Sequence, residues 1–118
     1  MSEIKVHKMV LSGSGSYEST AKIADVSKSV VSCVITYTDA VGTTALNTDL
    51  ILELSADNGS NWSTATLVAM PDSSPGIKVA KVDNLAVTAG TQLKHKITFA
   101  NQASDTKVTQ VNGVDLIY

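Results

Sequence analysis

The 118-residue chain contains no arginine, one cysteine and five aromatic residues. Its nine basic side chains are therefore all lysine, and its formal net charge is -2. A nucleic-acid reader usually presents a basic patch and the bidentate guanidinium fork of arginine, so the composition argues against a nucleic-acid partner. Cys33 alone cannot form an intrachain disulfide, which excludes the small disulfide scaffolds of secreted proteins.

Long apolar runs are also missing from the chain. None approaches the ~18 residues of a membrane span, so we expect no membrane partner. The N-terminal segment from Met1 to Lys8 carries charges where a signal peptide needs ~7 to 15 apolar residues, so we expect synthesis in a cytoplasm. The chain length leaves room for one domain, residues 1–118.

Hydroxyl-bearing and β-branched residues are abundant in the chain. Ser and Thr make up 27 residues, and Val, Ile and Thr make up 34, against 9 Leu, 3 Glu and 3 Gln. Strand formers thus outnumber helix formers. The composition predicts an all-β fold with little or no helix.

Turn signals divide the chain into short segments that alternate with a period of two. The turns are expected at Ser12 to Ser16, Asp39 to Asn47, Asp57 to Gly59, Pro71 to Gly76, Asp83-Asn84, Ala89-Gly90 and Asn101 to Asp105. The strands are expected near residues 4–11, 17–24, 30–38, 48–55, 61–69, 77–83, 92–100 and 107–118. Seven to eight such strands favour an antiparallel β-sandwich of jelly-roll-like type.

The alternation predicts which side chains face the core. In segment 92–99, the expected core face carries Leu93, His95, Ile97 and Phe99. In segment 48–55, it carries Leu50, Leu52 and Leu54, with Ile51 as an aliphatic exception on the other face. In segment 30–38, it carries Val31, Cys33, Ile35 and Tyr37.

Segment 30–38 also has aliphatic side chains on its second face, including Val30 and Val34. Either this strand is central and well covered, or its outer face meets another chain. We therefore take Val30, Val34 and Ile51 as candidate protein contacts.

The sharpest local motif is S-x-D-x-G-x-x-W, formed by Ser55, Asp57, Gly59 and Trp62. It resembles the Asp-box, a hairpin signature of many β-proteins. Asp57 can accept hydrogen bonds from backbone amides, Gly59 can adopt a positive φ, and Trp62 can fold back over the hairpin. We interpret the motif as a structural turn, with Trp62 as an alternative contact for a ligand such as a sugar.

Residue types for catalysis or metal binding are sparse. His95 lies on an apolar face, Cys33 lies in an apolar strand, and neither has a neighbouring partner in the sequence. The Asp57 loop lacks the alternating acids and closing Glu of a calcium loop. Neither a nucleophile elbow nor a phosphate-binding glycine loop is present. We expect no enzyme activity, no cofactor and no metal.

The N-terminal residues 1–11 precede the segment Ser12-Gly13-Ser14-Gly15-Ser16, whose composition is typical of a flexible linker. They are either the first strand of the domain or an extended arm that pairs with the sheet edge of a neighbouring subunit.

Residues 50–118 carry a family resemblance. The segment from Leu50 to Trp62, an apolar strand followed by the S-x-D-x-G-x-x-W motif, is similar to β-domains of tailed-bacteriophage structural proteins. The closing segment from Val111 to Tyr118 looks like the last strand of such domains. The resemblance implies a virion structural protein without catalytic activity.

Within that class, one free-standing β-domain is typical of a capsid decoration, or cement, protein. The resemblance implies that it is made in the host cytoplasm, binds the outer surface of the shell, bridges major capsid protein subunits and forms a homotrimer. The rivals are a carbohydrate- or receptor-binding module of a tail or head fibre, using Trp62, Tyr17 or Tyr37 as a stacking platform, and a tail accessory component.

Overall fold

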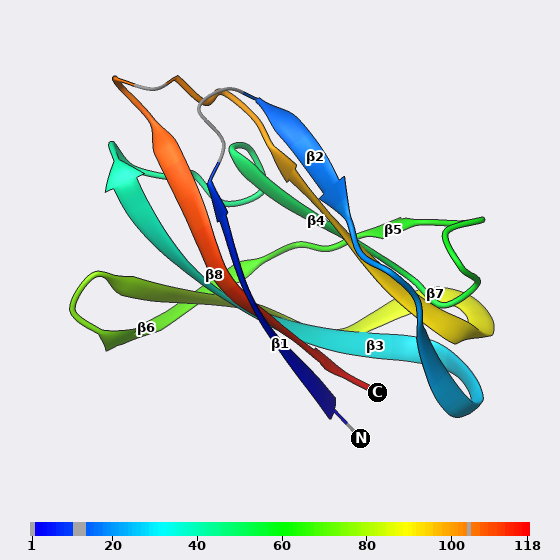
Figure 1. The fold of residues 1–118 in the computed structure, drawn as a ribbon. Helices are drawn as coiled ribbons and strands as arrows, with labels where there is room; N and C mark the ends of the chain where they lie inside the picture. The colour runs from blue at the N-terminus through cyan, green and yellow to red at the C-terminus, as the bar shows by residue number, and fades with distance from the viewer. Residues whose placement is uncertain (1, 11–13, 104) are drawn as a thin grey trace.

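The computed structural model describes residues 2–10, 14–103 and 105–118, and this part of the chain is all-β without helix (Figure 1). Every strand pairing is antiparallel. The strands are β1 (Ser2–Val10), β2 (Gly15–Glu18), β3 (Lys22–Val41), β4 (Leu50–Ser55), β5 (Ser63–Thr64), β6 (Val68–Ser74), β7 (Ile77–Phe99) and β8 (Val108–Ile117). The predicted antiparallel all-β class is confirmed.

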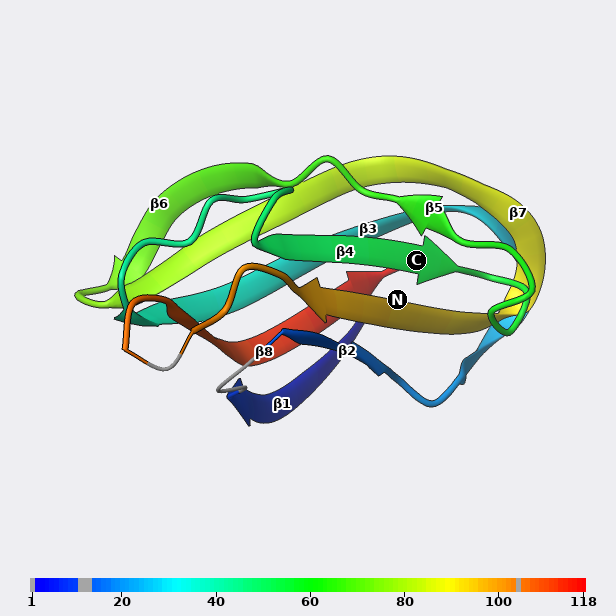
Figure 2. The same ribbon diagram turned by 90° about the horizontal axis from the view of Figure 1, so that it is seen from above.

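The strands form two sheets that share β7. Sheet A has the order β1-β8-β3-β7-β6, and sheet B has the order β2-β7-β4-β5. The first part of β7 pairs with β3 and β6, whereas its last part pairs with β4 and β2. Figure 2 shows β7 bending around one end of the molecule and returning beside β4. The two sheets are therefore joined by one continuous backbone.

The length of β7 corrects the predicted turns at Asp83-Asn84 and Ala89-Gly90. Residues 77–83 and 92–100 were expected as separate strands, but they belong to one strand. Asn84 has a φ of 53° and donates its backbone N–H to Ser32 Oγ at 2.8 Å. Its left-handed conformation therefore serves an irregularity within the paired β3 and β7, where the register shifts, rather than a chain reversal.

Other strand boundaries also differ from the predicted ones, because an edge strand tolerates residues that are typical of turns. The predicted strand 61–69 divides into the short β5 and the separate β6. Strand β6 continues through Pro71 to Ser74. Of the turn predicted from Pro71 to Gly76, only Pro75 and Gly76 therefore form a turn. A proline is acceptable at position 71 because β6 is an edge strand with its seven residues exposed.

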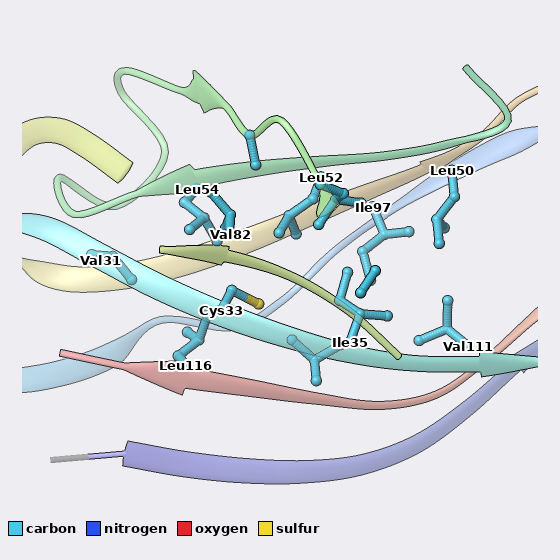
Figure 3. Packing of buried hydrophobic residues seen from close by; sticks show 14 of the residues in the cluster. Val31, Cys33, Ile35, Leu50, Leu52, Leu54, Val82, Ile97, Val111 and Leu116 are labelled. Atoms are coloured by element: carbon cyan, nitrogen blue, oxygen red, sulfur yellow. The ribbon is translucent and has the colours of Figure 1, made fainter. Parts of the chain in front are cut away.

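The core lies between the two sheets and is mostly aliphatic (Figure 3). The predicted core faces of β4, of the end of β7 and of β3 are all buried, which confirms the period-two assignments. From sheet B, Leu50, Leu52, Leu54 and Ile97 face Val31, Cys33, Ile35, Val111 and Leu116 of sheet A.

The N-terminal strand β1 pairs with β8 of the same chain, from Ser2 opposite Ile117 to Val10 opposite Gln110. The beginning of β1 and the end of β8 consequently lie next to each other (Figure 1). Residues 2–10 therefore form the outermost strand of sheet A in this structure, while Met1 and Leu11 of the predicted strand or arm lie outside the described residues.

Candidate functional site

The turn from Ser55 to Trp62 is organised by one buried hydroxyl group. Ser55 is 1% exposed and donates to Asp57 Oδ1 at 2.7 Å. The same Oγ accepts from the backbone N–H groups of Asp57 at 3.3 Å and Gly59 at 3.0 Å. Three contacts of a single side chain thus close the turn.

The Asp57 carboxylate holds the second half of the turn. Its Oδ1 accepts from the backbone N–H of Asn61 at 2.9 Å, and its Oδ2 accepts from Asn61 Nδ2 at 2.7 Å. The Asn61 side chain, followed by the Ser55 hydroxyl, lowers the pKa of the Asp57 carboxyl. The ionised carboxylate is thus the form that these donors favour.

Two consecutive residues of this turn have left-handed backbone conformations. Asn58 has a φ of 61° and Gly59 a φ of 83°. A Cβ on Gly59 would lie 3.2 Å from Trp62 Cζ2, so the indole ring passes close over the glycine. Glycine therefore provides both the backbone conformation and the space for Trp62.

The turn docks on the middle of β7, a contact that the sequence does not reveal. Asn58 N–H donates to Gln92 O at 3.0 Å, and Gln92 N–H donates to Ala56 O at 3.0 Å. Gly90 lies against the same segment, because a Cβ there would be 2.7 Å from the carbonyl carbon of Ala56. This docking fixes the position of Trp62 relative to sheet B.

Ser55→Ala is expected to lower the free energy of unfolding by about 1 to 2 kcal/mol, because it leaves the part-buried amide groups of Asp57 and Gly59 without their acceptor. Chemical denaturation measures the change. Ser60→Ala is the matched control: its side chain is exposed, and we expect a change within about 0.5 kcal/mol. Equal stability of the two variants would contradict the organising role of Ser55.

The outer face of sheet B is polar and carries Trp62. Lys96 Nζ lies 4.8 Å from the Trp62 ring centroid and 3.8 Å from Glu53 Oε1. Beside it, Lys94 Nζ lies 2.6 Å from Glu18 Oε1, and this hydrogen bond lowers the pKa of Glu18. Ile51 pairs with Thr98 on the same face. A half-buried tryptophan and an isoleucine are thus surrounded by paired charges.

The outer face of sheet A is more apolar. Val30 and Ile117 are 45% and 44% exposed, and Val34 lies half-buried on the same face of β3 as Val30. The four predicted contact residues therefore do not form one surface. Val30 and Val34 lie on the outer face of sheet A, and Ile51 and Trp62 lie on that of sheet B.

A buried carboxylate that the sequence did not single out joins two loops. Asp49 is 1% exposed and accepts from Lys107 Nζ at 2.6 Å, Ala45 N–H at 2.8 Å and Asn101 Nδ2 at 2.9 Å. Burial alone would raise the pKa of Asp49, but these hydrogen bonds outweigh it and hold the pKa below 3.8. Its two side-chain donors, Asn101 and Lys107, are 52 and 58 residues away, so no local motif marks the site.

The other polar or aromatic candidates lie mostly in the interior. His95 is 4% exposed, with its ring centroid 6.1 Å from that of the half-buried Tyr17. Tyr37 is buried, so it does not provide the predicted stacking platform. Burial, followed by the charge of Asp115, raises the pKa of the Cys33 thiol to about 12, which disfavours the nucleophilic thiolate.

Within residues 14–103 and 105–118, no three His, Cys, Asp or Glu side chains gather as metal ligands. The described part of the chain contains no helix long and apolar enough to cross a membrane. No family model matches the chain, no curated protein matches its sequence, and no solved structure matches its fold.

Proposed function

We propose that the chain is a capsid decoration protein of a tailed bacteriophage, bound to the outer surface of the shell and bridging major capsid protein subunits. The observation that supports this function is the presence of two opposite faces, each with its own apolar residues, on a single rigid sandwich. A protein that bridges subunits needs one surface for the shell and another for its neighbours.

The outer face of sheet B is the proposed shell contact. Protein interfaces concentrate their binding energy in a few aromatic and aliphatic anchors surrounded by a polar rim. Trp62 and Ile51 are such anchors here, and the ion pairs of Lys94 and Lys96 form the rim. Hydrogen bonds of Ser55 and Asp57 hold the Trp62 turn in one conformation, so little ordering is required when it binds.

The same geometry weakens the sugar-binding alternative. A stacking platform needs an open ring face, but the Trp62 ring is contacted by Lys96 and passes close to Gly59. Tyr37, another proposed stacking residue, is buried. A protein partner that contacts both the ring edge and the charged rim fits this surface better.

Purified protein is expected to co-sediment with bare shells assembled from the major capsid protein of its phage, and to raise the temperature at which the shells break. Ile51→Lys is expected to weaken this binding at least about tenfold, because it places a charge at the centre of the contact. Quantitative co-sedimentation measures the affinity.

Thr88→Lys is the matched control, because it adds the same charge to an exposed position of β7 that lies within the part paired with β3 and outside the part paired with β4. Its binding is expected to equal that of the wild type. Absence of wild-type binding to the shells contradicts the decoration function. Equal binding of the two variants contradicts the assignment of sheet B as the shell contact.

A further inference from the structure

The outer face of sheet A carries rows of paired residues from three neighbouring strands, β7, β3 and β8. Val34 of β3 pairs with Lys81 of β7 on one side and with Asp115 of β8 on the other. In the next outward-facing row, Thr36 pairs with Val79 of β7 and with Gly113 of β8. In each row, the residue from β7 therefore differs in charge or size from the residue of β8 on the other side of β3.

Asp115 is half-buried and pairs with Val34. Its Oδ1 is buried, and no donor among the described residues reaches it. Lys81 lies 2.7 Å from Asp83, but the Asp83 side chain is 61% exposed, and such a surface pair is weak. Val34 thus has a carboxylate on its β8 side, and on its β7 side an ammonium group whose own partner is a weak surface ion pair.

We propose that the outer face of sheet A packs against the same face of a second copy of this chain, with a twofold axis parallel to β3 at Val34. This rotation exchanges the β7 side and the β8 side of each row. Lys81 of each copy then lies opposite Asp115 of the other, and the two Val34 side chains meet at the axis. Each of the two symmetric ion pairs would join the Asp115 carboxylate of one copy to the Lys81 ammonium group of the other.

The remaining positions of the face fit the same rotation. Val79 of one copy lies opposite Gly113 of the other, so a larger side chain meets a position without one. Strand β6, where Val68 and Met70 are 55% and 37% exposed, lies over β1 of the other copy. A twofold axis perpendicular to β3 within the contact plane instead places Lys81 on Lys81 and Asp115 on Asp115, which is unfavourable.

The size of the molecule is sufficient for this contact. It measures 44 × 27 × 21 Å, and a stable interface buries roughly 800 Å² on each partner. Sheets packed face to face lie about 10 Å apart with their strands aligned within about 30°, which keeps the two β3 strands side by side. The contact is a dimer, in place of the trimer that the family resemblance implies, and it leaves the proposed shell face of sheet B free.

Analytical ultracentrifugation of the purified full chain, over a wide range of concentration, tests the proposal without any shell. The wild type is expected to be a dimer. Lys81→Asp alone and Asp115→Lys alone place like charges opposite each other, so each is expected to weaken dimerisation at least about tenfold. Ile51→Lys on sheet B is the control and should remain dimeric.

Mixing supplies the sharper result. The Lys81→Asp and Asp115→Lys variants, each weakened in self-association, are expected to form a heterodimer when mixed, because both symmetric contacts then join opposite charges. The Lys81→Asp/Asp115→Lys double variant is expected to dimerise with itself for the same reason. A merely structural role of either residue predicts no such rescue.

A second pair of variants covers the case in which Asp115→Lys fails to fold. The axis places position 34 against itself, so Val34→Asp and Val34→Lys are each expected to be monomeric and to form a heterodimer when mixed. A monomeric or trimeric wild type overturns the proposal, as does failure of both mixtures to associate. Shell binding is measured separately, so a failure to dimerise and a failure to bind shells can be distinguished.

Discussion

Gly90→Ala is expected to destabilise the fold by about 3 kcal/mol or more, enough to reduce the yield of folded protein. The added Cβ would overlap the carbonyl oxygen of Ala56 and lie 3.1 Å from Asp57 Cα. Both neighbours are backbone, so no side-chain rotation relieves the contact. Either β7 or the Ser55–Trp62 turn must move, and the hydrogen bonds between Gln92 and the turn are then strained.

Thermal and chemical denaturation measure this loss, with Gly76→Ala as the control. Gly76 has a φ of 81°, but a Cβ there meets no atom within 4 Å. Its substitution carries only the conformational penalty of about 1 kcal/mol. If Gly90→Ala is no more destabilising than Gly76→Ala, the turn does not pack against β7 as the structure shows.

Asp49→Asn is expected to lower the free energy of unfolding by about 3 kcal/mol at neutral pH. The amide removes the charge that faces Lys107 and replaces one acceptor oxygen by an NH2 group, which faces either Asn101 or, in the flipped orientation, Ala45 and Lys107. Urea denaturation at pH 7 measures the change. Asp105→Asn, an exposed position close to Lys107 in the same loop, should change stability by no more than about 0.5 kcal/mol.

The same carboxylate predicts a pH dependence. Because the folded-state pKa of Asp49 lies below its ordinary value of 3.8, its contribution is fully present above about pH 4 and is lost as the pH falls through the folded-state pKa. The wild type should therefore lose stability more steeply on acidification below about pH 4 than Asp49→Asn does. Parallel stability curves for the two proteins would contradict the role of the buried carboxylate.

Side-chain alternation predicted the core well because its physical cause is local. Successive residues of a strand point to opposite faces, and Leu50, Leu52 and Leu54 can only share one of them. The hydrogen-bonding capacity of Asp57 is likewise visible in the motif, since its donor Asn61 is four residues away. Features with partners within a few residues are therefore accessible from the sequence.

The errors arise where the same local signal serves two structures. Asn84 adopts a positive φ and Gly90 lacks a Cβ, as turn residues do, yet both lie within a continuous strand. Whether these residues form a turn or continue a strand depends on β3, which pairs with this part of β7 and lies about 50 residues earlier. Topology also separates Val34 from Ile51, because only the sheet order shows that their outer faces are opposite.

The central place of β7 limits how the chain can fold during its synthesis. Strands β2 and β6 pair with β7, β1 pairs with β8, and β3 pairs with β7 and β8. Among the first six strands only β4 and β5 pair with each other, through two residue pairs. Among the described residues before β7, the native strand pairing is thus limited to this short hairpin. Sheet B can assemble once β7 is complete, whereas sheet A also needs β8, which follows it.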